Sequence, residues 1–290
     1  MARHDPRRPL MGRVVIVGSI NVDQIARVER HPKPGETVLA IAHQELAGGK
    51  GANQAIAAAA AGADVLMVGC VGEDDLGTAY RHRLAERGID VTHVWASRSE
   101  PTGAAYITVD EDRENTIVVV PFANQGVANG WPEHFPDLNA GDVVVLQLEI
   151  DLSAVRWAAE RAHERGARVV LNIAPYADLP SSLLALADPI VANEHEALRL
   201  ADSGAGAGSL LVTMGANGAV WDGQVVPAVE VAPADVIDTT GAGDAFVGAL
   251  AAALAAGASR EEAMRAAAVA GADAVTYPGA QRDARLRGRR

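Results

Sequence analysis

Residues 238–244, Asp-Thr-Thr-Gly-Ala-Gly-Asp, place small residues between carboxylates and lead into an alanine-rich helical pattern. Gly241, Ala242 and Gly243 let a ligand approach the backbone, and N–H groups at a helix start favour an anion such as phosphate. Asp244 would repel that anion as a ligand. It can instead act as a general base that takes a proton from a hydroxyl group while the N–H groups stabilise a transferred phosphoryl. A helix-capping aspartate after a glycine turn is the alternative interpretation.

A second glycine-rich segment, residues 48–54 (Gly-Gly-Lys-Gly-Ala-Asn-Gln), also enters a helical pattern. It is not a P-loop, because glycine rather than Ser or Thr follows Lys50. Gly49 admits a close ligand, and Lys50 and Asn53 can form hydrogen bonds with hydroxyl groups. No G-x-G-x-x-G pattern follows a strand, which argues against a dinucleotide-dependent oxidoreductase. The segment therefore predicts a site for a hydroxyl-bearing ligand.

Further polar residues follow apolar, strand-like runs. Asn21 and Asp23 occupy alternate positions and so point the same way, which suits a pair of vicinal hydroxyls, although an Asx turn is the alternative. Glu149 ends another apolar run and is open to the same two interpretations. Asn193 and Glu196 can face one way to hold a hydrated magnesium ion, or they can simply begin a helix.

These segments need a scaffold that brings them together. Apolar runs typical of buried strands recur at 14–17, 65–71, 143–148, 168–173, 190–192 and 210–214. Helical patterns that end at a glycine lie between several of them, at 52–61, 76–87 and 153–165. The alternation predicts an α/β fold with a mainly parallel central sheet and helices on both faces. Such sheets bind ligands at the carboxyl ends of their strands.

Two regions, at about 22–45 and 97–122, break this rhythm. They are rich in Val, Ile and Thr, contain turn signals, and predict a small antiparallel β sheet that projects as a lid. Residues 219–226 predict a hairpin, and Ser259 with Glu262 has the spacing of a capping box. We expect one domain over residues 14–281.

Composition excludes several classes of protein. The 290 residues are 49% hydrophobic and 21% charged, with a net charge of −12 and a single cysteine. One cysteine rules out an intramolecular disulfide framework, and the lack of a signal peptide predicts a cytoplasmic protein. No apolar run reaches the ~18 residues of a transmembrane helix. Residues 1–13 and 282–290 are Arg-rich and predict disordered tails, while the acidic body would repel nucleic acid.

Four separated motifs, at 18–23, 48–55, 193–196 and 238–244, resemble the PfkB (ribokinase-like) family of carbohydrate kinases in their order. The resemblance covers about residues 14–281. It implies transfer of the γ-phosphoryl of ATP to the 5-hydroxyl of D-ribose, giving D-ribose 5-phosphate. Asp244 is implied as the base, with Gly241, Ala242 and Gly243 as the anion hole. The implied sugar ligands are Asn21, Asp23, Gly49, Lys50, Asn53 and Glu149.

The resemblance also implies nucleotide and cation sites. The implied nucleotide residues are Asn193, Thr213, Gly215, Asn217, Gly218 and Gly243. Mg²⁺ is implied near Asn193 and Glu196, through water. A monovalent cation, expected to be K⁺, is implied at Asp238, Thr240, Ala274, Tyr277, Gly279 and Asp283, the last of which stands where the family commonly has serine. A homodimer through the lid sheet is also implied.

Two alternatives to a ribose kinase remain open. One or two pocket side chains can redirect the same scaffold to 2-deoxyribose, fructose or adenosine. A non-catalytic sugar-binding protein is the second alternative, because the loop at 200–211 is short and the usual last helix of the family is missing. Asp244 beside its glycine loop argues against that second alternative, since a binding protein has no need of a base there.

Overall fold

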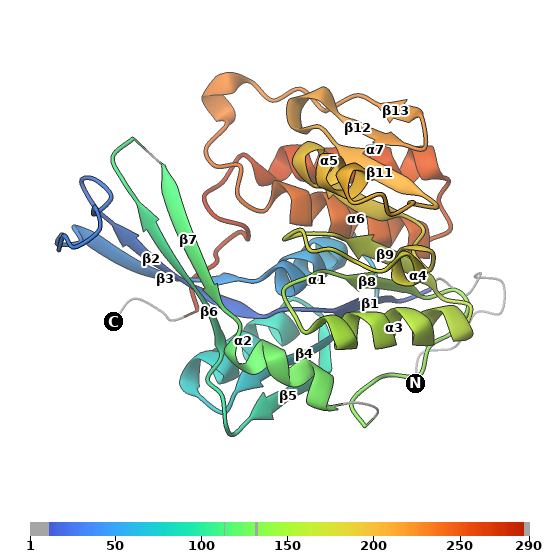
Figure 1. The fold of residues 1–290 in the computed structure, drawn as a ribbon, viewed down its shortest axis with the longest axis horizontal. Coiled ribbons are helices and arrows are strands. Elements are labelled where there is room, and N and C mark those ends of the chain that lie inside the picture. Colours follow the sequence, from blue (N-terminus) through green and yellow to red (C-terminus); the bar gives the residue numbers. More distant parts are fainter. Residues whose placement is uncertain (1–11, 113, 131–132, 287–290) are drawn as a thin grey trace.

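A large sheet forms the centre of the computed structural model, which describes residues 12–112, 114–130 and 133–286 (Figure 1). Its strand order is β13-β12-β11-β10-β9-β8-β1-β4-β5. The parallel strands are β1 Val14–Val17, β4 Val65–Gly72, β5 Asp90–Ser97, β8 Val143–Leu146, β9 Arg168–Asn172, β10 Ile190–Asn193 and β11 Leu210–Thr213. The predicted hairpin follows as β12 Ala219–Trp221 and β13 Gln224–Val226. The predicted α/β fold is confirmed.

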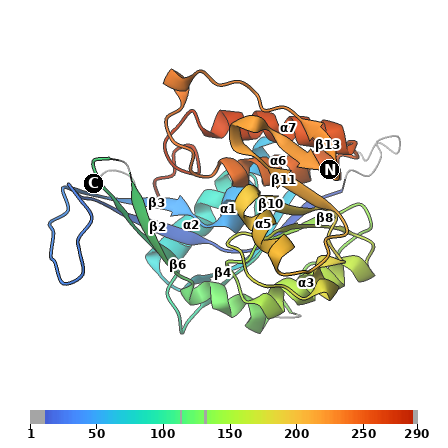
Figure 2. The ribbon, with the colours of Figure 1, turned by 45° about the horizontal axis from the view of Figure 1, so that its top comes forward.

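Helices cover both faces of this sheet (Figure 2). One face carries α1 Lys50–Ala60, α2 Asp75–Glu86, α6 Ala242–Ala255 and α7 Arg260–Ala274. The other face carries the 3₁₀ segment η1 Phe122–Gly130, α3 Leu152–Glu164, α4 Ser181–Leu184 and α5 Glu194–Asp202. Alternation along β1 explains the two cores, because Val14 and Ile16 face the first set of helices while Val15 and Val17 face the second.

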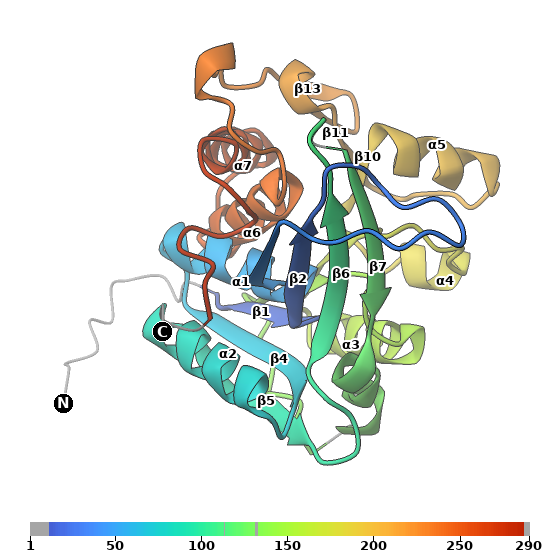
Figure 3. The same ribbon diagram turned by 90° about the vertical axis from the view of Figure 1, so that its left-hand side faces the viewer.

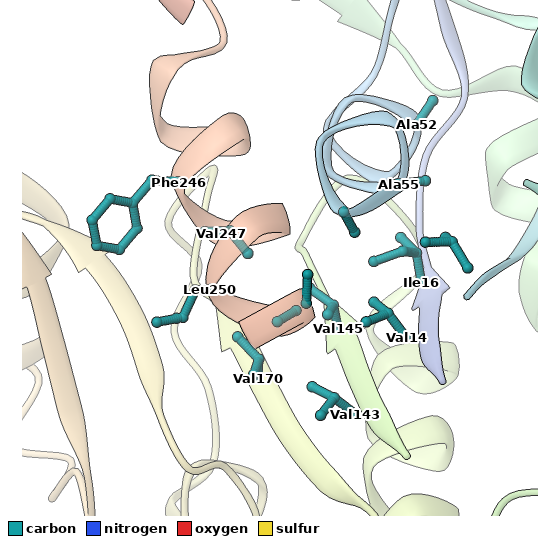
Figure 4. Close-up of a cluster of buried hydrophobic side chains, with 14 of the residues drawn as sticks. Val14, Ile16, Ala52, Ala55, Val143, Val145, Val170, Phe246, Val247 and Leu250 are labelled. Atoms are coloured by element: carbon teal, nitrogen blue, oxygen red, sulfur yellow. The ribbon is translucent and has the colours of Figure 1, made fainter. Parts of the chain in front are cut away.

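Small residues bring α1 and α6 close together above the sheet. Ala52, Ala55 and Val247 belong to the same buried core, in which Ala52 and Ala55 lie on the side of α1 that faces away from Val247 (Figure 4). A Cβ on Gly248 would lie 2.4 Å from the backbone oxygen of Gln54. The two helices therefore touch through backbone, and their N-terminal turns, which carry the two glycine-rich motifs, are held side by side.

The lid is a four-stranded sheet in the order β3-β2-β6-β7 (Figure 3). Its strands are β2 Asn21–Arg27, β3 Ala42–Gly48, β6 Gly103–Val109 and β7 Asn115–Val120. The outer pairs are antiparallel as predicted, but the central pair β2 and β6 is parallel. The reason is that β2 follows β1 and β6 follows β5, and both of those strands run the same way through the large sheet.

The two ends of the fold differ from the predicted tails. Gly12 donates to the backbone oxygen of Ala255, and Arg13 forms an ion pair with Asp142 at 2.9 Å. At the other end, the backbone oxygen of the buried Ala284 accepts from the N–H of Ala47 at 2.7 Å. The rest of the predicted tails, 1–11 and 287–290, lies outside the described residues. Among those that are described, no helix is long and apolar enough to cross a membrane.

Candidate active site

Asp244 lies in the first turn of α6 with a side chain only 7% exposed. Its Oδ2 accepts from Nδ2 of Asn53 at 2.9 Å, and its Oδ1 accepts from Nε2 of Gln54, also at 2.9 Å. Both donors are neutral amides on α1. A carboxylate has room for about four hydrogen bonds, so these two fix its orientation and leave lone pairs for a hydroxyl proton. The arrangement suits a positioned general base.

The turn before Asp244 has the geometry of an anion site. Gly241 has a φ of +79°, and a Cβ there would lie 2.5 Å from the Cα of Ala280, so only glycine fits. The first bond within the helix runs from the N–H of Ala245 to the oxygen of Gly241. The N–H groups before that bond have no partner within the helix and lie at its positive end, although that of Ala242 donates to the backbone oxygen of Thr239 at 3.3 Å. A Cβ on Gly243 would meet no described atom within 4 Å, which leaves space for a ligand.

Glu149 gathers the sugar-side residues predicted from separate motifs. Its Oε2 accepts from Oγ of Ser19 at 2.6 Å, from the backbone N–H of Lys50 at 3.1 Å, and from Nδ2 of Asn21 at 3.5 Å. The positive φ of Gly49 allows this, since a Cβ there would lie 2.6 Å from the backbone nitrogen of Asn21. Glu149 thus caps the start of α1. The N-cap residue of this helix is Gly49, which has no side chain that could do so.

Carboxylates dominate the electrostatics of this pocket. Burial raises the pKa of Asp23 to about 7, and the nearby carboxylates of Glu149 and Asp244 add to the effect. A Cβ on Gly48 would lie 2.3 Å from both oxygens of Asp23, so glycine makes room for that side chain. The carboxylates, Asp244 foremost, raise the pKa of Lys50 and keep it charged. The pocket suits a neutral ligand that both donates and accepts hydrogen bonds.

The predicted magnesium pair forms a capping box at the start of α5. The N–H of Asn193 donates to Oε2 of Glu196 at 2.9 Å, and the N–H of Glu196 donates to Oδ1 of Asn193 at 2.8 Å. The helix-start interpretation is therefore the one the structure displays, and a role toward magnesium stays a prediction. Within the described ranges, no cluster of three or more His, Cys, Asp or Glu side chains is arranged to hold a metal ion.

Asp238 joins two of the segments predicted to hold a monovalent cation. Its Oδ1 accepts from the N–H of Thr240 and its Oδ2 from the N–H of Gly279, both at 2.9 Å. Burial raises the pKa of Asp238, but these hydrogen bonds outweigh it and lower the pKa overall. Ala274 ends α7 just before Val275, whose oxygen accepts from the N–H of Asp238 at 3.3 Å.

The last two predicted cation residues make other contacts. The guanidinium of Arg282 lies 4.3 Å from the ring centre of Tyr277. Asp283 turns its backbone oxygen toward α2, where it accepts from Arg83 at 2.6 Å. The structure therefore links Asp238 directly to Thr240 and Gly279, whereas Tyr277 contacts Arg282 and Asp283 is bound to α2.

The predicted nucleotide residues lie in three places: Asn193 at the start of α5, Gly243 in the first turn of α6, and the other four at the end of β11 and in the turn after it. Thr213 ends β11, and Gly215–Asn217 forms a 3₁₀ turn that Gly218 closes with a φ of +93°. The sequence did not predict a nearby cavity of about 500 Å³ between residues 229–237 and α7. Its lining includes three exposed apolar side chains, Val229, Ile237 and Val269. Apolar residues in this loop and on the outer face of the helix are the feature of the sequence that could have indicated a binding surface here.

Several buried polar residues behind the base were also not predicted. Gln54 donates to Oδ1 of Asn172 at 3.1 Å as well as to Asp244, and it accepts from Nε2 of Gln147 at 2.7 Å. Gln281 donates to Oδ1 of Asn53 at 2.8 Å. The sequence does show polar residues within apolar segments, which could have indicated buried polar side chains. It does not show which of them pair, because the paired residues are more than 90 positions apart in the chain.

Known proteins resemble this chain over nearly its full length. Residues 11–286 match the family described as pfkB family carbohydrate kinase. The ribokinase of Haemophilus influenzae is 36% identical over 289 residues, which cover 92% of this chain and 94% of the relative. The deoxyribokinase of Salmonella typhi is 35% identical over 295 residues, with the same two coverages. Arabidopsis thaliana ribokinase, solved with ribose and ATP, has a TM-score of 0.81 at 33% identity and covers 93% of this chain and 94% of its own.

Proposed function

The chain belongs to the pfkB family of carbohydrate kinases, and from that premise we propose that it transfers the γ-phosphoryl of ATP to the 5-hydroxyl of D-ribose. One observation carries the proposal. Asp244 stands in the first turn of α6, at the positive end of the helix, and both of its oxygens are oriented by amides that do not neutralise it. The relatives named ribokinase support ribose as the acceptor.

The proposed reaction uses the two glycine-rich motifs together. Asp244 accepts the proton of the 5-hydroxyl as that oxygen attacks the γ-phosphorus and the bond to the leaving ADP breaks. The N–H groups of Gly241, Ala242 and Gly243 stabilise the charge on the transferred group. The proton rests on Asp244, and ribose 5-phosphate and ADP leave.

The sugar is held by side chains that are already close together. Asn21, Asp23 and Glu149 offer oxygen acceptors for the ring hydroxyls, and the charged Lys50 offers donors. Asn53 stands between the sugar region and the base. This density of acceptors favours a sugar with several free hydroxyls over an apolar substrate.

ATP, Mg²⁺ and K⁺ complete the proposed site. The nucleotide lies along Asn193, Thr213, Gly215, Asn217, Gly218 and Gly243, with its base toward the cavity lined by residues 229–237. Only one oxygen of Glu196 is used in the capping box among the described residues, so the other can accept from a water of magnesium. Asp238, Thr240, Ala274, Tyr277, Gly279 and Asp283 form the proposed K⁺ region. These cations supply positive charge that offsets the phosphates.

A second acceptor, 2-deoxyribose, is favoured by the similarity to a deoxyribokinase. The two sugars differ by one hydroxyl, so the choice depends on whether a buried acceptor such as Asp23 or Glu149 needs that hydroxyl as its partner. Ribose is the first choice because the pocket holds more acceptors than donors.

We also propose a cytoplasmic homodimer that forms through the small sheet. Exposed apolar side chains gather on the edge strand β7 and its neighbour β6, namely Ile117, Val118 and Val119 on β7 and Tyr106 on β6. A sheet edge with such residues needs a cover, and a second copy of the same surface provides one.

The test is ADP release from ATP and Mg²⁺ with ribose, 2-deoxyribose, fructose or adenosine, each with and without K⁺. We expect turnover to be greatest with ribose and to rise with K⁺. Greater turnover with another acceptor would reassign the substrate. No turnover with any acceptor, while ribose raises Tm, would replace the kinase by a sugar-binding protein.

A further inference from the structure

Gln281 is a buried amide whose hydrogen-bonding groups are all in use. Its side chain is 1% exposed. Nε2 donates to Oδ1 of Asn53 at 2.8 Å and to the hydroxyl of Tyr80 at 2.9 Å, while Oε1 accepts from Nε of Arg83 at 3.0 Å. The hydroxyl of Tyr80 in turn donates a hydrogen bond to the backbone oxygen of Gly48 at 2.6 Å. The amide group therefore cannot flip, exchanging its oxygen and nitrogen, without losing all of these hydrogen bonds.

These contacts form one chain of hydrogen bonds that runs from a cation to the base. Arg83 donates to Gln281, Gln281 to Asn53, and Asn53 to Asp244. Because an arginine can only donate and a carboxylate can only accept, the two ends decide how both amides between them must face. Each bond polarises the next in the same sense, so the chain is cooperative.

We propose that Gln281 is a positioning residue for phosphoryl transfer, which turns the amide of Asn53 so that its N–H faces Asp244. The proposal rests on the proposed function of Asp244 as the base. The oxygen and nitrogen ends of an asparagine amide are nearly the same size, so partners and not shape decide which end faces the carboxylate. Without the donor from Gln281, the oxygen of Asn53 is free to face Asp244 and repel it.

The C-terminal segment that carries Gln281 lies against both the anion turn and the small sheet. Its Ala280 packs on Gly241, and its Ala284 pairs with Ala47 on the lid strand β3. Figure 3 shows this segment running from α7 past α1 toward α2. Gln281 is thus placed where the anion turn, the lid and the base meet.

The experiment compares Gln281→Glu and Gln281→Met with the wild type. Glutamate keeps the acceptor for Arg83 and the size of the side chain, but it cannot donate to Asn53. Methionine removes both functions without adding charge. We expect kcat to fall about 10–100-fold in both variants, with KM for the sugar within about threefold, because the orientation of the base is lost while the other proposed sugar ligands, Asn21, Asp23, Lys50 and Glu149, stay in place. Lys50, Asp23 and Glu149, the charged groups that face Asp244 from other elements, are unchanged.

Two control variants distinguish loss of the orientation of the Asn53 amide from a general weakening of the C-terminal segment. Arg87→Met removes an exposed bond to the backbone oxygen of Arg282 and so weakens the same segment without touching the chain of amides. Gln125→Glu makes the same chemical change on an exposed residue. Both should keep kcat. A purely structural role for Gln281 predicts that Arg87→Met lowers kcat as well, in step with Tm.

A second measurement reads the amide without turnover. In the ligand-free protein, the side-chain NH₂ signals of Asn53, assigned by their absence in Asn53→Ala, should shift in Gln281→Glu and stay in Gln125→Glu. Unchanged kcat in folded Gln281 variants, or unchanged Asn53 signals, would overturn the proposal. A wild type inactive with every acceptor would instead overturn the proposed function, and the NMR signals would still decide the role of Gln281.

Discussion

The acceptor side and the nucleotide side of the site differ in how completely the protein fixes its own side chains. Asp244, Asn53 and Gln281 are each less than 10% exposed and form one hydrogen-bonded chain with Arg83. On the nucleotide side, Asn193, Asn217 and Thr240 are exposed. In the proposed reaction, rigid orientation is thus concentrated where a proton must leave a hydroxyl, while the proposed phosphate contacts are mainly backbone groups and turns.

Removing the base should have the largest effect and would break this comparison most directly. Asp244→Asn should lower kcat roughly 10²–10⁴-fold with little change in the KM for ribose, because the amide cannot accept the proton. Steady-state ADP release measures both quantities. Asp202→Asn, an exposed change at the end of α5, serves as the control. Equal kcat in Asp244→Asn would exclude the proposed base.

Substitutions in the anion turn should separate folding from nucleotide binding. Gly241→Ala should lower the free energy of unfolding by about 2–4 kcal/mol, since the left-handed backbone and the contact with Ala280 both oppose a Cβ. Gly243→Ala should leave Tm nearly unchanged but raise the KM for ATP. Thermal melts and ATP titrations measure the two effects, with Gly206→Ala as a neutral control. A stable Gly241→Ala protein would contradict the geometry described.

The pH dependence of stability should show that the acceptor side is desolvated before the sugar binds. The pKa of Asp23 is about 7 in the folded protein against an ordinary 3.8. A raised acid pKa contributes stability at low pH that is lost as pH rises from about 4 through 7. Asp23→Asn should therefore be more stable than the wild type at pH 8, by about 1–3 kcal/mol, and equal to it near pH 4.

Melting curves of the ligand-free protein between pH 4 and 8 make this test. Asp202→Asn should show no such trend. A constant difference between Asp23→Asn and the wild type over the whole range would mean that Asp23 is well solvated.

Filling the cavity beside α7 should have the smallest effect and should touch only the nucleotide side. Ala272→Phe places a ring in the cavity and should raise the KM for ATP about 3–10-fold, with kcat at saturating ATP and the KM for ribose nearly unchanged. Ala266→Phe, on the exposed face of the same helix, is the matched control. An altered KM for ribose would show that the two sides are not separate.

Local patterns predicted the scaffold and the motifs, but not the contacts behind them. The apolar runs at 14–17 and 143–148 and the glycine-ended helices appear near their predicted positions, and the capping box at Ser259 is confirmed. The edge strand β5 was missed, because only Val94 among its residues is buried and its pattern reads as polar.

Side-chain pairing explains the rest of the misses. Gln281 bonds to Asn53 across 228 positions of the chain, and nothing local to either residue indicates that contact. Residues 282–286 look like an Arg-rich tail in sequence, yet Arg83 donates to the backbone oxygens of Arg282 and Asp283 and holds this segment against α2. The charge of the arginine side chains could not show whether this segment is solvated or has its backbone oxygens bound by another part of the protein.

The parallel pairing of β2 with β6 has a mechanical consequence. It places all four connections of the small sheet in one row, with Asn21 opposite both Gly48 and Gly103, and Ala104 opposite Val120. The small sheet is therefore attached to the large sheet along one edge only, and its far turns project away from that edge. We therefore expect any bending or rotation of the small sheet about its supported edge to displace most the turns that follow Arg27 and Val109, and to displace least the strand ends over the proposed sugar site.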